Sequence, residues 1–182
     1  MTSLLKKYKP VIRFVLLFLG VYILLSLLYG LYLDVSKDAA YKPDFITNLV
    51  AKQSSNLISN FGYDAQVSPN KIEPTMRLTV NDKYLAKIVE GCNAISIIIL
   101  FIAFIIAFAE GFRKTFFFLL AGVTLIYSIN ILRIVILAIS LYEYPQHEEI
   151  LHGVIFPALI YGMVFLLWMV WVRTLKKEAR DE

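Results

Sequence analysis

The sequence predicts an all-α polytopic membrane protein with about four transmembrane helices and a small extracytoplasmic α+β insert between the first two helices. Hydrophobic residues make up 59% of its 182 residues and charged residues 18%, whereas soluble domains average roughly 45–50% and about 25%. Four largely uncharged runs, at 14–33, 91–109, 115–142 and 153–172, approach the ~20 residues that cross a hydrocarbon core. A bilayer is therefore the expected solvent.

The first run is predicted to be a retained helix. Its apolar core exceeds the roughly 7–15 residues of a signal peptide, and no small-residue cleavage site follows it. We therefore divide the chain into a cytoplasmic tail with the first helix (1–33), an extracytoplasmic insert (34–90), a three-helix membrane core that holds the candidate catalytic residues (91–172), and a cytoplasmic tail (173–182).

The cations beside the apolar runs predict the orientation. They form three groups: Lys6, Lys7, Lys9 and Arg13; Arg113 and Lys114; and Arg173, Lys176, Lys177 and Arg180. With four crossings these groups share one side, which the positive-inside rule makes cytoplasmic. We expect a multi-pass protein of the cytoplasmic (inner) membrane with both termini in the cytoplasm. Because the cations belong to these clusters, the net charge of +4 does not indicate nucleic acid as a partner.

The insert is predicted to fold as one helix and a few strands. Apolar residues recur at helical spacing in 44–60, which is typical of an amphipathic helix on the outer surface. Alternating apolar and polar residues in 76–80 and 83–89 flank Asn81 and Asp82, a pair that suits a tight hairpin turn.

Arg133 lies inside the third apolar run, where an arginine costs about 2.5–3.5 kcal/mol on insertion scales. Such a charge needs a partner or a function. Asn130 precedes it by one helical turn on the same face and is expected to hold the guanidinium. The structural alternative is an ion pair with a carboxylate such as Glu90 or Glu143.

Cys92 begins the second run and His152 begins the last, so both are expected at the outer face. The chain has one cysteine, which excludes an internal disulfide and a CxxC-type zinc site; we expect no metal and no cofactor. Cysteine is often a buried packing residue, but a thiol at a helix N-terminus forms its thiolate more readily. Cys92, Arg133 and His152 together have the residue types of a cysteine acyl-transfer site. His147, in the preceding loop, is the less favoured histidine.

Three short motifs resemble the exosortase/archaeosortase family, and most closely its compact exosortase F type. They are Val89-Glu90-Gly91-Cys92-Asn93-Ala94, Asn130-Ile131-Leu132-Arg133-Ile134 and His152-Gly153. The resemblance implies that Cys92, Arg133 and His152 form a catalytic set. It also implies a sortase-like cysteine transpeptidase that processes C-terminal sorting signals of exported proteins.

The resulting hypothesis is a thiolate attack by Cys92, proton transfer by His152 and oxyanion stabilisation by Arg133. Glu90 is expected either to orient His152 or to pair with Arg133, or simply to cap the junction between the hairpin and the helix. The expected partners are the lipid bilayer, a sorting-signal helix and an acceptor nucleophile of unknown identity. Two alternatives stay open, namely a non-enzymatic assembly subunit and a small transporter component, although the chain shows no internal repeat of the kind typical of transporters.

Overall fold

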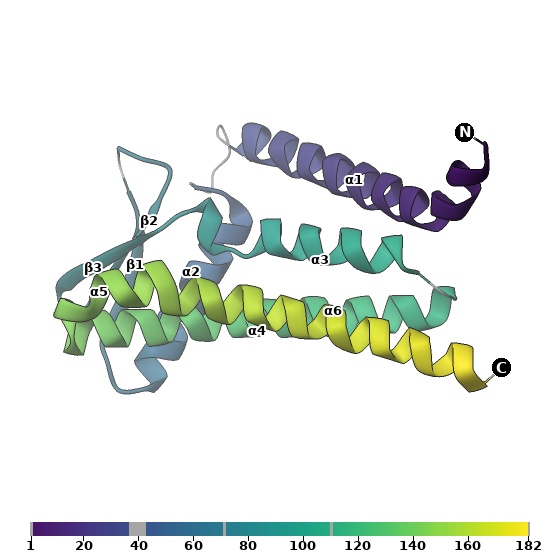
Figure 1. The fold of residues 1–182 in the computed structure, drawn as a ribbon. Helices are drawn as coiled ribbons and strands as arrows, with labels where there is room; N and C mark the ends of the chain where they lie inside the picture. The colour runs from purple at the N-terminus through teal and green to yellow at the C-terminus, as the bar shows by residue number, and fades with distance from the viewer. Residues whose placement is uncertain (1, 37–42, 71, 110, 182) are drawn as a thin grey trace.

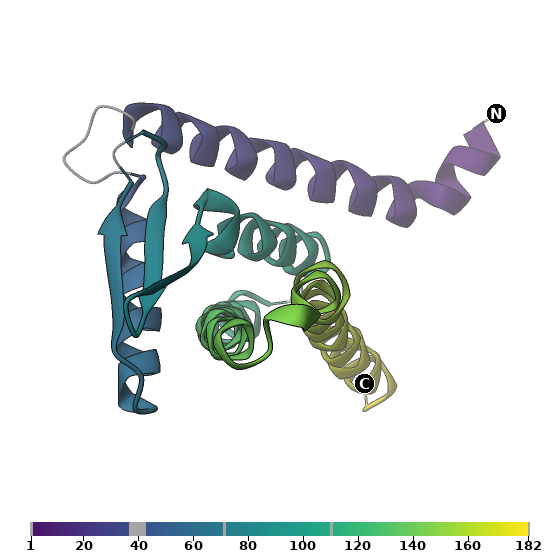
Figure 2. The same cartoon turned by 90° about the vertical axis from the view of Figure 1, so that its left-hand side faces the viewer.

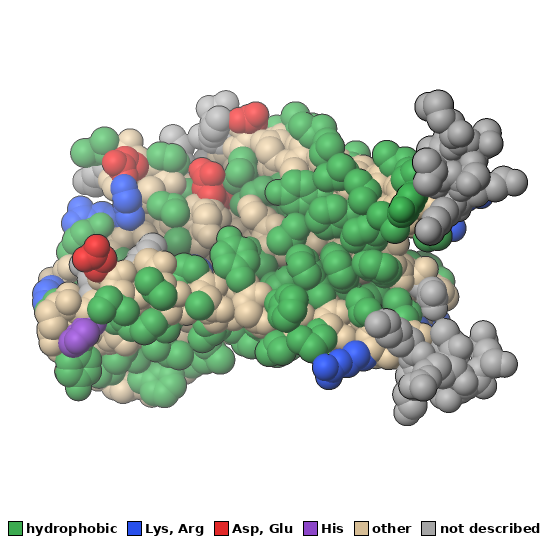
Figure 3. Space-filling view, in the orientation of Figure 1, with side chains coloured by type: hydrophobic (Ala, Val, Ile, Leu, Met, Phe, Trp, Pro, Cys, Tyr) green, Lys and Arg blue, Asp and Glu red, His purple; other side chains and the backbone are tan. Residues whose placement is uncertain are grey.

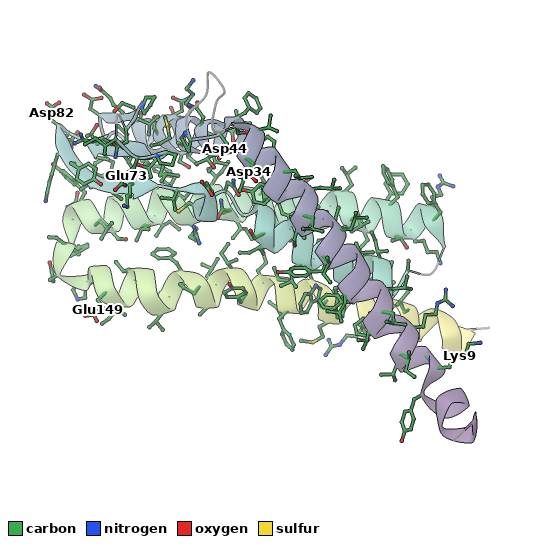
Figure 4. The ribbon with its side chains drawn as sticks, turned by 90° about the horizontal axis from the view of Figure 1, so that it is seen from above. Lys9, Asp34, Asp44, Glu73, Asp82 and Glu149 are labelled. Atoms are coloured by element: carbon green, nitrogen blue, oxygen red, sulfur yellow. The ribbon has the colours of Figure 1, made fainter. Side chains whose placement is uncertain are left out.

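The computed structural model describes residues 2–36, 43–70, 72–109 and 111–181. Helices α3, α4 and α6 lie roughly alongside one another, with a small sheet and helix α2 at one end and both chain termini at the other (Figure 1), and α1 crosses them obliquely (Figure 4). In chain order the elements are α1 (Thr2–Ser36), α2 (Phe45–Asn60), β1 (Ala65–Pro69), β2 (Met76–Val80), β3 (Lys83–Ile88), η1 (Glu90–Cys92), α3 (Ile95–Ala107), α4 (Phe112–Glu143), η2 (Pro145–His147), α5 (Glu148–Ile150), η3 (Leu151–Ile155) and α6 (Phe156–Asp181).

Within the described residues, three helices are long and apolar enough to cross a membrane: Tyr8–Ser36, Phe112–Glu143 and Gly153–Leu175. The predicted fourth crossing is not confirmed. Helix α3 has only 13 residues, and at 1.5 Å per residue it extends ~20 Å, less than the hydrocarbon core of about 30 Å.

The prediction that this helix begins at Gly91 was wrong. Residues 91–94 leave the helical path because a 3-10 turn ends at Cys92 and Ala94 adopts a left-handed conformation with φ 64°. A left-handed residue cannot continue a right-handed helix, so α3 starts only at Ile95.

The surface of the long helices is apolar. Leu16, Leu27 and Leu31 of α1 are each more than 60% exposed, and hydrophobic side chains cover the middle of the bundle while charged side chains gather around the sheet (Figure 3). Seen from above, Lys9 lies at one end of the molecule and Glu73, Asp82 and Glu149 at the other (Figure 4). An apolar band between two charged ends matches the polytopic membrane protein that the composition predicted.

The insert folds as the hairpin pattern predicted. Strands β2 and β3 pair in antiparallel fashion, and the connecting Asn81 and Asp82 have φ of 48° and 61°, which is the type I′ geometry that these residues favour. Strand β1, which no separate sequence pattern predicted, completes a sheet of order β1-β2-β3.

Helix α2 lies along one face of this sheet (Figure 2). The Asp44 side chain caps it by accepting hydrogen bonds from the backbone N–H groups of Ile46 and Thr47, both at 3.0 Å. The hydrophobic cluster beneath the sheet continues onto α4 through Ile134 and Ala138. The insert is therefore packed on the membrane helices and shares a core with them.

Candidate active site

Cys92 lies in a tight turn that connects strand β3 to helix α3. Its backbone N–H donates to the Val89 carbonyl at 2.8 Å, and the N–H of Asn93 donates to the Glu90 carbonyl at 3.3 Å. Since α3 begins three residues later, Cys92 does not head the helix as predicted. The partial charge of a helix N-terminus falls off within the first turn, so the sequence argument that placed Cys92 at the head of a helix does not apply.

Asn93 fixes this turn to two other elements. Its side chain is 1% exposed and donates to the Tyr29 hydroxyl of α1 at 2.8 Å and to the Thr47 hydroxyl of α2 at 3.0 Å. Its side-chain oxygen accepts from the N–H of Ile95 at 2.9 Å, which caps α3. The sequence alone does not reveal this role of Asn93, because its hydrogen-bond partners are 46 and 64 residues away in the chain.

Asn130 also holds the turn, in contrast to the prediction that it would hold Arg133. Its side-chain amide donates to the Cys92 carbonyl oxygen at 2.7 Å, and the side chain is 1% exposed. The prediction was wrong about the partner because it considered only neighbours on the same helix. The turn that holds Cys92 contacts α4 at Asn130, and the Cys92 carbonyl accepts the hydrogen bond of the Asn130 amide.

The guanidinium of Arg133 has no counterion among the described side chains. Its Nε atom is buried without a hydrogen-bond partner. Of the two carboxylates considered for pairing, Glu143 accepts a hydrogen bond from Tyr63 at 3.0 Å, and Glu90 makes no bond to Arg133 in the described part of the chain. Arg133 therefore keeps its donors available, which is an expensive state for a charge in a membrane helix.

Cys92 and Arg133 line the same cavity, which has a volume of about 310 Å³. Strand β3 and the turn form one wall, α4 forms the second, and Phe156 and Pro157 at the start of α6 form the third. Most of the remaining lining is aliphatic, which lowers the local dielectric and strengthens electrostatic interactions within the cavity. A thiol and a cation from different elements thus line one shared cavity.

The two histidines lie in the connection between α4 and α6. The backbone of His152 belongs to the π-helix η3, four residues before Phe156 of the cavity wall, and its side chain lies outside the described part of the structure. π-helical turns are frequent at functional sites. His147 ends η2 and is exposed.

Lys87 brings a second cation to the rim of the cavity. Its ammonium group donates to the Glu73 carboxylate at 3.0 Å, and this hydrogen bond raises the pKa of Lys87 above its ordinary value. Both side chains are about half exposed, so the pair contributes little to stability. No group of three or more potential metal ligands occurs among the described residues.

A sequence comparison identifies the family. The model of the family described as transmembrane exosortase matches residues 9–173, which is almost the whole chain of 182 residues. No match was found among curated proteins or among solved structures. Since the match covers the insert, the cavity lining and most of each membrane helix, the chain belongs to the transmembrane exosortase family.

Proposed function

We propose that this protein is a membrane-embedded cysteine peptidase or transpeptidase that processes the C-terminal sorting signals of exported proteins at the outer face of the cytoplasmic membrane. The observation that carries the proposal is the cavity that Cys92 and Arg133 share. It places the chain's single thiol beside a cation without a counterion among the described side chains. Membership of the exosortase family supports the same activity.

The proposed reaction begins when the Cys92 thiolate attacks the carbonyl carbon of a substrate peptide bond. The C–N bond then breaks, the acyl group stays on sulfur as a thioester, and the leaving amine takes a proton from His152. Water or an amine or hydroxyl acceptor next attacks the thioester carbonyl and gives its proton to His152. The C–S bond then breaks and sulfur leaves as the thiolate, which restores the starting state. Water makes the enzyme a protease, and another acceptor makes it a transpeptidase.

Arg133 is proposed to stabilise the oxyanion that forms in each attack. A guanidinium offers five N–H donors in a fixed plane, and donors that already point at the developing charge contribute a few kcal/mol to lowering the barrier. The buried Nε without a partner supports this role, because an arginine that only locks two helices together is expected to be paired. Glu90, half-buried at the start of the same turn, remains a candidate for orienting His152.

The substrate tail is proposed to approach as a neighbouring helix within the bilayer. A second, open hollow runs along α4 and α6 and is lined mainly by aliphatic side chains, with the small residues Ala158 and Gly162 among them. Arg133 borders this hollow as well as the cavity. A helix lying in the hollow would therefore end beside the proposed nucleophile.

The orientation can be tested by labelling. We propose that the sheet end is extracytoplasmic, because the cation clusters lie toward the other end. In a Cys92→Ser background, Asp82→Cys should react with an impermeant maleimide in intact cells and Thr174→Cys only after lysis; both native side chains are exposed. Labelling of Thr174→Cys in intact cells would reverse the orientation.

The nucleophile is tested by mass spectrometry of the C-termini of exported proteins. Cells with the wild-type protein should yield a set of shortened C-termini that is missing when Cys92→Ala or Cys92→Ser replaces it, while both variants accumulate in the membrane. Serine is a decisive control because it keeps the shape but cannot supply a thiolate. Normal processing by the alanine variant would leave the assembly-subunit alternative as the better description.

A further inference from the structure

The free edge of strand β3 lies at the candidate active site. In the described sheet of order β1-β2-β3, only β2 pairs with β3, and β3 runs through Val89 directly into the turn of Cys92. An edge strand presents unpaired backbone N–H and C=O groups that can pair with another extended chain. Which groups of β3 are available in this way depends on which of its residues face away from β2.

The hydrogen bonds of the central strand β2 show which backbone groups of the sheet face each neighbour. Asn70 N–H donates to the Thr75 carbonyl at 2.8 Å, and Asn81 N–H donates to the Asp64 carbonyl at 2.7 Å. Both bonds lie on the β1 side of β2, so the odd-numbered residues of β2 face β1 and the even-numbered ones face β3. Pro69, which has no N–H, pairs with Met76, and this agrees with the assignment.

On β3, the register then gives each residue its direction. Ile88 is opposite Met76 and Ala86 is opposite Leu78, so their backbone groups face β2. Lys87 lies between them, and in an antiparallel ladder its N–H and C=O therefore point to the free edge. The N–H of Val89 points the same way, while the Val89 carbonyl already accepts from Cys92.

The cavity occupies the space beside this edge. Its lining includes Ala86 and Ile88, whose side chains share one face of the strand, and also Lys87 and Val89 from the alternate positions. A hollow under one face alone would contact only alternate residues. The cavity therefore reaches around the edge, and it ends at Cys92 and Gly91.

We propose that the free edge of β3 binds the substrate as an added strand, with backbone pairing at Lys87 and Val89 delivering the scissile peptide bond to Cys92. The occupant is an extended peptide segment next to the sorting-signal helix, recognised through its backbone, with an apolar side chain directed into the aliphatic cavity. This inference rests on the proposed peptidase function and adds how the substrate is held.

The test compares two substitutions at Lys87 in the full-length protein in cells. Lys87→Pro removes the outward N–H without breaking the ladder to β2, since proline is tolerated where the N–H faces away from the sheet. Lys87→Ala removes the charge but keeps the N–H. Both variants lose the ammonium group and only the proline variant loses the N–H, so we expect Lys87→Pro to give a yield of shortened C-termini roughly tenfold or more below that of Lys87→Ala.

A proline at Tyr84 is the matched control for folding. Tyr84 follows the pair that closes the hairpin, Val80 and Lys83, so its N–H also points outward, but it lies eight residues from Cys92. Tyr84→Pro should process substrates at near wild-type yield. Equal yields from Lys87→Pro and the wild type, with Cys92→Ala inactive, would overturn the edge pairing and leave the peptidase proposal intact. An active Cys92→Ala would overturn both.

A crosslinking measurement covers the case in which Lys87→Pro fails to accumulate. In the Cys92→Ala background, the photo-crosslinker p-benzoylphenylalanine is placed at Lys87 or at the exposed Gln66 of β1, on the opposite edge. Position 87 should crosslink the uncleaved exported proteins and position 66 should not. Equal crosslinking at both positions, no crosslinking at 87, or crosslinks only between two copies of this chain would each overturn the proposal.

Discussion

Asn130→Leu is expected to displace Cys92 while the level of the protein in the membrane stays near normal. Asn130 is a buried residue of α4 whose amide donates to the Cys92 carbonyl at 2.7 Å. Leucine has the same branched arrangement of four side-chain heavy atoms, but it is larger and has no donor. The substitution thus leaves the carbonyl of the turn without its partner while keeping an apolar side chain of similar shape in the helix.

The expected effect follows from the cost of that unpaired carbonyl. A buried polar group without its partner costs about 1–3 kcal/mol, and each 1.4 kcal/mol corresponds to a factor of ten. If the turn bears this cost, the population with Cys92 correctly placed falls by about 5- to 140-fold. The yield of shortened C-termini should fall by the same factor, while the level of the protein in the membrane stays near normal.

The single cysteine makes a second readout possible. Because Cys92 is the chain's only thiol, the rate of alkylation by a membrane-permeant maleimide reports this residue alone. A loosened turn should expose the half-buried thiol and raise its alkylation rate while processing falls. Ser128→Ala, an exposed position on the same helix, should change neither. Unchanged processing and unchanged alkylation in Asn130→Leu would refute the positioning role.

Three further predictions address the remaining parts of the molecule. Arg133→Lys and Arg133→Leu should both accumulate normally and both fail to process exported proteins, because an ammonium cannot reproduce the planar donor set; near-normal cleavage by the lysine variant would contradict the oxyanion role. His152→Ala should abolish the shortened C-termini and His147→Ala should not, as measured by the same mass spectrometry, and the reverse result would exchange their roles. Gly122→Ala should destabilise the protein by about 1–3 kcal/mol because its methyl group would collide with a buried phenylalanine ring of α3. Thermal aggregation in detergent measures this loss, and Gly20→Ala, which meets open space, is the neutral control.

The sequence predicted the elements whose signals are local. Hydropathy located α1, α4 and α6, and the turn residues Asn81 and Asp82 located the β2–β3 hairpin with its correct strand bounds to within one residue. Both signals act within a few residues, so no tertiary contact is needed to interpret them.

The errors arose where long-range contacts decide the local structure. Hydropathy could not distinguish the turn at 91–94 from the helix that follows, because Ala94 is a good helix former and its left-handed conformation depends on neighbours. Asn93 ties this turn to α1 and α2, and Asn130 ties it to α4. Cys92 and Arg133 were expected on one face of the membrane, but the wall that β3 contributes to their common cavity had no sequence signal.

The position of β3 also bears on a physical difficulty of cleaving a membrane-anchored tail. A peptide bond within a helix is shielded by neighbouring turns, so in the proposed reaction the tail would have to unwind before Cys92 attacks it. Each backbone group released in lipid costs several kcal/mol if it stays unpaired. A strand edge at the cavity offers the outward N–H and C=O of Lys87 and the outward N–H of Val89, so the unwound segment would exchange helical hydrogen bonds for sheet hydrogen bonds. On this argument the insert between α1 and α3 lowers the cost of unwinding, and Lys87→Pro should impair processing even though its side chain takes no part in the chemistry.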